Sequence, residues 1–426
     1  MERRKFINLT AAGAGALMTV PMVSSGSTNI VKNPRNGNAK ISGLKNNTAI
    51  AMWDFSWILR HHRYGEFENW DAVLEGLAER GYDSIRMDAM PQFVAADADG
   101  SIQEEFRSEK KDWIPALWGN DMTMSFRPRE ALLEFLPKCR KYGIKVGLAT
   151  WFLRHNTERT GIFIEEGGLL RAWKETLEFL EKNNLLDDNI MYVDLLNEYP
   201  DVHGFDWLKN EMNKRSDIKK FKLDNPDAHL PEFPENEEGN PLKKMFYNDF
   251  LNALINDMRK SYSQFDYFAS LHTWSYKNVT KTNFDAIDNH VWFQHNGSIP
   301  GTDIIGGRKV ENDFRQVYAG LKTFWKENKQ TLVDWMDGQI AMVANDASRQ
   351  NVVCGNTEGW GSVLWLDHPE IDWKWIKESA EICVDLALKH KEYRFICTSN
   401  FTHPHFKGIW EDVEWHRQIT SRIRKG

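Results

Sequence analysis

Residues 145–200 contain one complete strand–helix–strand pattern, and this pattern decides the fold class. KVGLATWF begins at Lys145, LLRAWKETLEFLEKNN at Leu169 and IMYVDLLNEYP at Ile190. The first and last runs are short and apolar, as is typical of buried strands, whereas the middle segment has the apolar spacing of an amphipathic helix. Two successive strands joined through a helix run parallel in one sheet. The stretch therefore predicts a parallel α/β sheet.

The same alternation extends from residue 49 almost to the C-terminus. The other predicted strands are AIAMWDF (from Ala49), DSIRMDA (from Asp83), YFASLHTW (from Tyr267), FDAIDNHVWF (from Phe284), VVCGNTE (from Val352) and RFICTSN (from Arg394). Helical patterns lie between most of them, and several end on Gly or Asn. Eight strands alternating with helices predict a single catalytic domain over residues 48–426, a (β/α)8 TIM barrel. The alternative is an open doubly wound sheet, which expects a Gly-rich turn after the first strand, where SWILRHHRYG stands instead.

The composition of the 426 residues restricts the class of protein and its partners. With 54 Lys+Arg against 61 Asp+Glu, the net charge of −7 offers no basic surface for nucleic acid. A hydrophobic fraction of 41% and a charged fraction of 27% are those of a folded soluble protein. The four cysteines, Cys139, Cys354, Cys383 and Cys397, show no CxxC pairing, so we expect free thiols and no structural zinc.

The N-terminus predicts export. Residues 1–26 combine Arg3, Arg4 and Lys5 with the apolar run AAGAGALMTVPMV and a small-residue exit. The arginine pair resembles a twin-arginine signal, and the alternative is an ordinary signal peptide with two incidental arginines. A polar segment, residues 27–47, follows, and no later run is apolar enough to span a membrane. We therefore expect a periplasmic or extracellular protein without membrane contact after signal removal.

One polar segment, about residues 207–244, is too long for a turn and follows the fourth strand. On a barrel it predicts a long loop on the catalytic face, where such loops shape a binding cleft.

Two glutamates follow predicted strands directly. Glu198 ends the fourth strand in LLNEYP, and Glu358 ends the seventh in GNTEGWG. Active sites of such barrels lie at the carboxyl ends of the strands, and glycosidic cleavage requires a pair of carboxyl groups, one protonated and one ionised. Asp334 and Asp337 in LVDWMDGQ are rival candidates for the nucleophile, although their surroundings have a helical pattern.

Asn197-Glu198 and the run from Thr357 to Trp360 resemble the signature of the clan of retaining (β/α)8 glycoside hydrolases that contains cellulases, mannanases and β-galactosidases. The nearer resemblance, over the whole chain after the leader, is to the cellulase-like glycoside hydrolase family. It implies hydrolysis of β-linked glycosides or oligo- and polysaccharides, with Glu198 as general acid/base and Glu358 as nucleophile.

Further roles are implied by the same resemblance. Asn197 would bind the 2-hydroxyl of the sugar, and Arg86 on the second strand would keep Glu358 ionised. His290 fits the His-x-Tyr pattern of the sixth strand, but Trp292 stands where the clan has Tyr. Retention predicts carboxyl groups ~5 to 5.5 Å apart, against ~6.5 to 9.5 Å for inversion. We expect the proton on Glu198 and a depressed pKa at Glu358.

The chain contains 18 tryptophans, and aromatic rings at strand ends are candidate sugar platforms. The candidates are Trp53, Trp57, Trp151, Trp274, Trp292, Trp360 and Trp365, and for each of them core packing is an equal alternative. Asp54, Asp88, His155, His272 and Thr273 are candidate hydroxyl ligands at strand ends.

Two other classes remain open. A metal-dependent sugar-converting barrel would use Glu198, Asp288, His272 and His290 as ligands, yet no HxH or HxxE pair occurs at a strand end. A catalytically inactive carbohydrate-binding barrel would keep the fold without turnover. The resemblance implies a carbohydrate substrate, and we expect no metal. Because no dinucleotide or iron–sulfur motif occurs, we also expect no cofactor.

Overall fold

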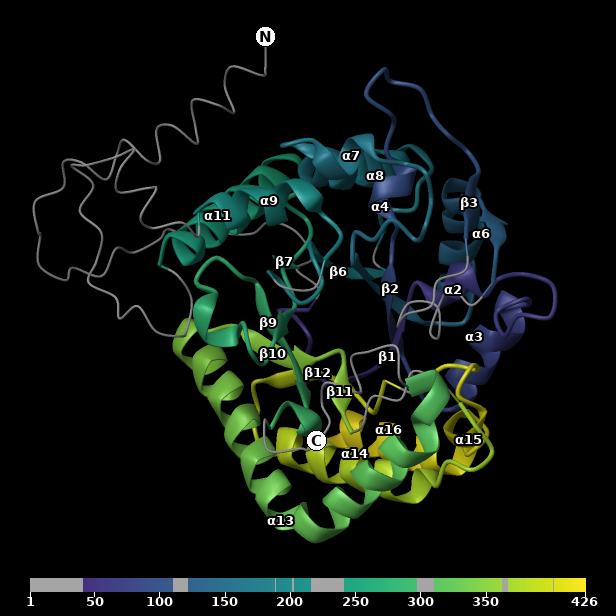
Figure 1. The fold of residues 1–426 in the computed structure, drawn as a ribbon, viewed down its shortest axis with the longest axis vertical. Coiled ribbons are helices and arrows are strands. Elements are labelled where there is room, and N and C mark those ends of the chain that lie inside the picture. Colours follow the sequence, from purple (N-terminus) through teal and green to yellow (C-terminus); the bar gives the residue numbers. More distant parts are fainter. Residues whose placement is uncertain are drawn as a thin grey trace, which may run out of the picture.

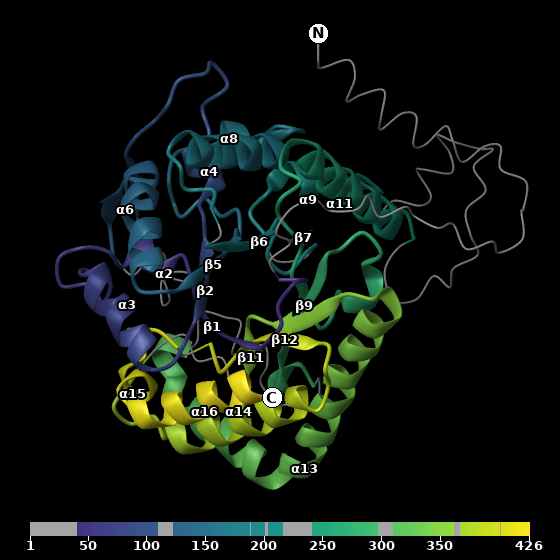
Figure 2. The same ribbon diagram turned by 180° about the vertical axis from the view of Figure 1, so that it is seen from behind.

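The computed structural model of the protein describes residues 41–109, 122–187, 189–200, 203–215, 241–296, 310–361, 367–400 and 402–426. The predicted export signal, residues 1–26, lies outside the described residues. Figures 1 and 2 show a curled sheet in the middle of the molecule with helices packed around it.

All eight predicted strands form, and they run parallel. The strands are β1 (Thr48–Asp54), β2 (Ser84–Asp88), β5 (Lys145–Ala149), β6 (Ile190–Asp194), β7 (Tyr267–Phe268), β8 (Leu271–His272), β9 (Ala286–Trp292), β10 (Val353–Asn356), β11 (Gly359–Trp360) and β12 (Tyr393–Cys397). The predicted strands from Tyr267 and from Val352 are each interrupted, the first giving β7 and β8, the second β10 and β11.

The sheet closes into a ring. Its hydrogen-bonded order is β11-β9-β10-β12-β1-β2-β5-β6-β7, and β8, which continues β7, pairs with β9. The closing pairs are Leu271 with Asn289 and His272 with His290. Barrel strands that follow one another in the sequence are therefore neighbours in the sheet, and the last strand, β12, pairs with the first, β1. The prediction of a (β/α)8 barrel is confirmed, because a doubly wound sheet would have left two open edges.

Helices cover the outside of the ring (Figure 1). The longer ones are α3 (Trp70–Glu79), α6 (Pro128–Lys141), α8 (Gly168–Lys182), α9 (Asp206–Arg215), α11 (Pro241–Ser261), α13 (Val310–Gln350), α14 (Trp373–Leu388) and α16 (Val413–Lys425). Short helices are α2 (Ser56–Leu59), α4 (Pro91–Val94), α7 (Gly161–Ile164), α15 (Lys407–Trp410) and the 3-10 turns η2 (Tyr276–Asn278) and η3 (Phe293–His295).

Local chemistry explains where several helices begin and end. The side chains of Asn69, Asp372 and Asp412 accept backbone N–H groups at the starts of α3, α14 and α16. Gly81 and Gly143, just beyond α3 and α6, have φ values of 84° and 70°, a conformation that stops a helix and favours glycine.

Aromatic side chains fill the barrel interior. The ring of Tyr192 lies 4.9 Å from that of Phe268 and 6.2 Å from that of Phe395. Every residue of β1, β2 and β6 is buried, because strands of a parallel barrel are covered on both faces. This accounts for the unbroken apolar runs in the sequence.

The predicted loop over residues 207–244 is wrong at both ends. Residues 207–215 belong to α9 and residues 241–244 to α11, whereas residues 216–240 lie outside the described residues. The reason is a narrow apolar face: Leu208 and Met212, spaced four apart, are both buried. The charged residues around them obscured this apolar pattern in the sequence.

Three further features concern the periphery. β3 (Phe106–Ser108) and β4 (Met124–Phe126) form an antiparallel pair that the sequence did not predict. Ile41 is fully buried and, with Ser42, donates its backbone N–H to Asp266, so the end of the polar segment 27–47 packs on the barrel.

Within the described part of the chain, no helix is both long and apolar enough to cross a bilayer.

A glycine in the barrel interior tests this packing. A Cβ at Gly355 would lie 2.2 Å from the carbonyl oxygen of Phe395 and 2.3 Å from its ring. We expect Gly355→Ala to lower the free energy of unfolding by about 1–3 kcal/mol, because a crowded core cannot absorb the methyl group. Gly320→Ala is the control, since open space surrounds this position in α13, and it should raise stability by up to about 1 kcal/mol. Equal unfolding curves in urea for the two variants would contradict the packing described.

Candidate active site

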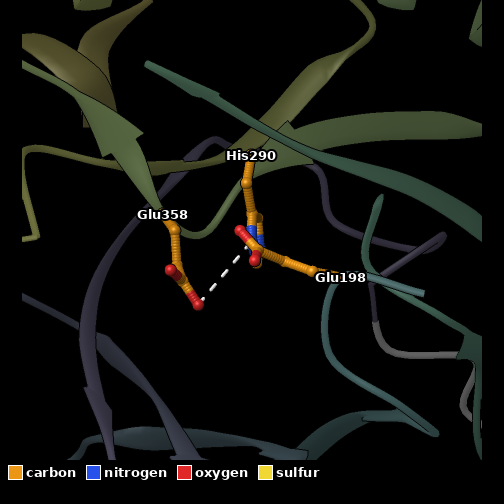
Figure 3. Close-up of side chains that lie close together, drawn as sticks. All are labelled: Glu198, His290 and Glu358. Atoms are coloured by element: carbon orange, nitrogen blue, oxygen red, sulfur yellow. Dashed lines mark hydrogen bonds and ion pairs between the residues drawn. The ribbon is translucent and has the colours of Figure 1, made fainter. Parts of the chain in front are cut away.

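Glu198 and Glu358 lie at the carboxyl ends of the fourth and seventh barrel strands, and their side chains converge. Glu198 follows β6 with a φ of 46°, a left-handed conformation that few residues other than glycine adopt. Glu358 lies in the interruption between β10 and β11. The two residues are 6% and 2% exposed. One oxygen of each carboxyl group and a ring nitrogen of His290 all lie within 4.8 Å of one another (Figure 3).

Arg86 from β2 is the central cation of the site. Its Nη1 donates to Oε1 of Glu358 at 2.7 Å and also to Asp54. Its Nη2 donates to Oδ2 of Asp194 at 3.1 Å and to Oδ1 of Asn197. The guanidinium is fully buried, and the three carboxylates raise its pKa although burial acts in the opposite direction. Its planar fork thus connects β2 with the ends of β1, β6 and β10.

His290 from β9 lies between the two glutamates. Its Nδ1 is 3.0 Å from Oε1 of Glu198 and 3.6 Å from Oε1 of Glu358. Its Nε2 is 3.2 Å from Oγ1 of Thr357, which gives its own proton to Asp288. Because Thr357 can then only accept, and because carboxylates face Nδ1, both ring nitrogens act as donors.

The pKa of His290 agrees with this hydrogen-bond pattern. Burial acts to lower it, but Glu358, Asp288 and Glu198 outweigh burial and hold the pKa well above its usual range. His290 is therefore an imidazolium that donates to Glu198.

The two glutamates differ in their pKa, in the order opposite to that expected from the sequence. Burial and the neighbouring carboxylates of Asp54 and Glu198 raise the pKa of Glu358 well above its usual range, despite His290 and Arg86. Burial also acts on Glu198, but its neighbours His272, His290 and Arg86 outweigh burial and lower its pKa. Burial is the largest cause at Glu358, and Arg86 does not offset it because its charge is shared among three carboxylates.

The expected tryptophans divide into buried and exposed residues. Trp53, Trp57 and Trp360 have no exposed surface, and Trp292 is only 3% exposed. The ring of Trp57 stacks on Phe135 at 4.7 Å, and its Nε1 donates to the carbonyl of Asp88. The prediction of open sugar platforms is therefore wrong for Trp53, Trp57 and Trp360, which are core residues. Trp365 lies outside the described residues.

Trp151 and Trp274 differ from this group. Trp151 is 8% exposed and donates through Nε1 to Asp54 at 2.9 Å, so it orients a partner of Arg86. Trp274, at the end of the fifth strand, is 67% exposed. Its neighbour His272 lies close enough to Glu198 to lower the pKa of that residue.

Sequence reasoning missed several polar residues that position the glutamates. Thr357 links Asp288 to His290, and Asn356 accepts the backbone N–H of Glu358 through Oδ1 at 2.9 Å. Asn400, just beyond β12, accepts the N–H of Gly359 at 2.8 Å and donates its own N–H to the carbonyl of Gly359. For these residues, the signal in the sequence was the position of Asn400 at the end of the eighth predicted strand.

The rival nucleophiles, Asp334 and Asp337, belong to α13 and not to a strand end. Asp334 accepts from Gln330 one turn earlier, and Asp337 lies 3.9 Å from Lys389. Neither is part of the group around Arg86.

A metal ion would find three potential ligands here, namely Glu198, His290 and Glu358. This ligand set differs from the predicted one. Asp288 accepts hydrogen bonds from Thr357 instead, and His272 is not part of the group. Both nitrogens of His290 act as donors in the present hydrogen-bond pattern, and Arg86 contacts Glu358, so a metal ion would have to displace a proton from His290 to bind here.

The parallel barrel described above is a fold that glycoside hydrolases share. A family model described as sugar-binding cellulase-like matches residues 50–424, and the chain belongs to this cellulase-like family.

Solved structures agree with the fold. A protein from Parabacteroides distasonis, named as a candidate glycoside hydrolase, is 27% identical with a TM-score of 0.70, covering 89% of this chain and 94% of that one. The cellulose synthase subunit Z of Clostridioides difficile is 11% identical with a TM-score of 0.51, covering 88% and 99%. No curated protein sequence matches the chain.

The charge of His290 can be tested directly. Asp288 lies 3.6 Å from Nε2 of His290 and favours the imidazolium, so Asp288→Asn should lower the pKa of His290. The measurement is NMR titration of the protein labelled with ¹⁵N at histidine. Asp285→Asn is the matched control, because Asp285 precedes the same strand and pairs with Arg259 instead. An unchanged His290 titration in Asp288→Asn would refute this assignment.

Proposed function

We propose that the protein is a retaining glycoside hydrolase that acts on β-linked glycosides or oligo- and polysaccharides. The observation that carries the proposal is the pair of buried carboxyl groups, Glu198 and Glu358, with oxygens within 4.8 Å of one another. Retaining enzymes hold their two carboxyl groups ~5 to 5.5 Å apart, whereas inverting enzymes need ~6.5 to 9.5 Å to admit a water molecule. The short separation therefore supports retention.

In the first step, an oxygen of Glu358 forms a bond to the anomeric carbon. The bond from that carbon to the glycosidic oxygen breaks with its electron pair on oxygen, which takes the proton of Glu198. In the second step, Glu198 takes a proton from water as the water oxygen bonds to the anomeric carbon. Glu358 leaves as a carboxylate, and Glu198 is protonated again.

The first step needs the proton on Glu198, whereas the free site favours it on Glu358. His290 offers a route because its Nδ1 lies 3.0 Å from Glu198 and 3.6 Å from Glu358. The imidazolium gives its Nδ1 proton to Glu198 and takes the proton of Glu358, so His290 ends as it began. The transfer leaves Glu358 ionised beside Arg86, which is the state required of a nucleophile.

Asn197 would bind the sugar next to the reacting carbon. Its Oδ1 accepts from Arg86, which fixes the amide, and its buried Nδ2 has no hydrogen-bond partner among the described residues. A buried donor without a partner is costly, so a substrate hydroxyl is a fitting acceptor. In retaining enzymes, hydrogen bonds to the 2-hydroxyl strengthen in the transition state.

The reaction and the role of each glutamate are tested by substitution. With aryl β-glycosides of glucose, mannose and galactose, Glu198→Gln and Glu358→Gln should each lower kcat by at least about 100-fold. Glu378→Gln on α14 is the control and should retain wild-type activity, because this side chain accepts hydrogen bonds from Trp325 and Lys329 of α13 and is not part of the group around Arg86. Near-wild-type rates in both active-site variants would overturn the proposal.

Added azide separates the two roles in the same assay. In Glu358→Ala, azide should attack the anomeric carbon directly and give an α-glycosyl azide, whereas Glu198→Ala should give the β-product through the glycosyl-enzyme. Product configuration is read by NMR.

Activity lost on addition of a chelator and restored by a divalent cation would favour a metal-dependent enzyme that uses Glu198, His290 and Glu358 as ligands. Sugar binding without turnover would indicate an inactive barrel.

We also propose that the protein is exported, on the basis of Arg3, Arg4 and the apolar run after them. Expression of the full chain in a bacterium should give a mature protein in the periplasm or medium that lacks about residues 1–26. Arg3→Lys with Arg4→Lys should retain it in the cytoplasm if the signal is of the twin-arginine type. N-terminal mass spectrometry of each fraction checks both points, and an intact N-terminus in every fraction would argue against export.

A further inference from the structure

The backbone around Glu198 is bonded to the strands on both sides of β6. The N–H of Asn197 donates to the carbonyl of Thr150, which follows β5, at 2.8 Å. The N–H of Tyr199 donates at 2.9 Å to the carbonyl of Ser270, which lies between β7 and β8. The left-handed residue Glu198, with its φ of 46°, stands between these two bonds, so the chain changes direction where the glutamate leaves the sheet.

The N–H of Glu198 itself is bonded to a side chain and not to a strand carbonyl. The Oγ of Ser270 accepts it at 3.2 Å. A buried N–H group without an acceptor is costly, and Glu198 is buried. The hydroxyl group of Ser270 therefore satisfies the one backbone donor that the left-handed turn takes away from the sheet.

Ser270 is also connected to the group around Arg86. Its hydroxyl donates to Oδ1 of Asn197 at 3.4 Å, and its backbone N–H donates to Oδ1 of Asp194 at 2.8 Å. Arg86 donates to the same amide and to the same carboxylate. Because a hydroxyl group has a single proton, donation to Asn197 leaves the lone pairs of Oγ to accept from Glu198. A continuous path of hydrogen bonds thus runs from Arg86 to the backbone of Glu198.

We propose that Ser270 is a positioning residue for the general acid/base, and that its hydroxyl group fixes the backbone of Glu198 and thereby the direction of the carboxyl group. The inference rests on the proposed hydrolase function. Ser270 has no exposed surface, so it acts through Glu198 and not by touching the substrate.

The consequence for catalysis is selective. Proton transfer requires the acid to lie within hydrogen-bond distance of the leaving oxygen, and a misplacement of about 1 Å costs about 100-fold in rate. The nucleophile Glu358 is held by Arg86 instead. Loss of the Ser270 hydroxyl group should therefore weaken proton donation more than nucleophilic attack.

The test compares leaving groups in Ser270→Ala, which removes the hydroxyl group without adding volume. The substrates are two β-glycosides of the same sugar, the phenyl glycoside, whose leaving oxygen needs a proton, and the dinitrophenyl glycoside, whose leaving oxygen does not. The variant should lower kcat/KM about 10- to 100-fold for the phenyl glycoside and less than about 3-fold for the dinitrophenyl glycoside. Ser270→Thr, which keeps a hydroxyl group, should recover part of the loss.

The second step gives an independent readout. For the dinitrophenyl glycoside the first step is fast, so kcat reports the attack of water, for which Glu198 is the base. Ser270→Ala should lower this kcat, and azide should restore it because azide attacks without a base. If azide leaves the lowered kcat unchanged, the loss does not arise at Glu198 and the proposal is wrong.

Ser84→Ala is the matched control. Ser84 is also fully buried, but its hydroxyl group contacts Thr48 and the carbonyl of Ala49 at the amino end of β2, away from the glutamates. This variant should leave the ratio of the two kcat/KM values unchanged. An equal loss on both glycosides in Ser270→Ala would overturn the proposal and make Ser270 a structural residue.

The bond to Ser270 can also be measured without turnover. Hydrogen exchange at the N–H of Glu198, followed by mass spectrometry of peptides that contain this residue, should be faster in Ser270→Ala than in Ser84→Ala or in the wild type. If the wild-type protein hydrolyses neither glycoside, the hydrolase function itself has failed, and the exchange rate still tests the bond. An exchange rate unchanged by Ser270→Ala would contradict the positioning of Glu198.

Discussion

The buried guanidinium of Arg86 is the interaction on which the rest of the site depends. It bonds Asp54, Asp194, Asn197 and Glu358, which come from or follow β1, β6 and β10, while Arg86 itself belongs to β2. A buried charge is tolerated only where partners and hydrogen bonds compensate for the loss of water. The carboxylates depend on Arg86 in the same way, because burying any of the three as an unpaired charge would also be costly. The strands that carry these residues must therefore end at the same level along the barrel axis, and this requirement fixes the position of Glu358.

One cation for three carboxylates leaves the centre of the barrel short of positive charge. Burial raises the pKa of Asp54 and Asp194 as well as that of Glu358, against the attraction of Arg86. His290 supplies the second positive charge, which Asp288 favours and which the hydrogen bond to Thr357 accommodates, although burial opposes it. The state of each glutamate is thus a property of the cluster. The protonation of the two glutamates is coupled, because both interact with the same two cations.

The fold was predictable from the sequence because barrel strands are buried on both faces. Runs such as AIAMWDF and IMYVDLL are apolar throughout, and the intervening helices have a clear apolar face. The errors occurred where that signal weakens. Leu208 and Met212, the two buried side chains of α9, lie among charges, and β3 and β4 are three residues long. The two glutamates were found because a charged residue directly after an apolar strand is unusual.

By itself, the sequence determined the alternation of strands and helices, the strand ends that carry Glu198 and Glu358, and the presence of Arg86 within a strand. These are local properties, set by the spacing of apolar side chains along the chain. Only the tertiary structure decided which carboxylates share Arg86, which glutamate has the higher pKa, and which tryptophans face solvent. Trp57 and Trp274 both stand near strand ends, yet one is buried against Phe135 and the other is exposed. Burial and electrostatic interaction depend on neighbours distant in the sequence, and those neighbours are defined only once the barrel closes.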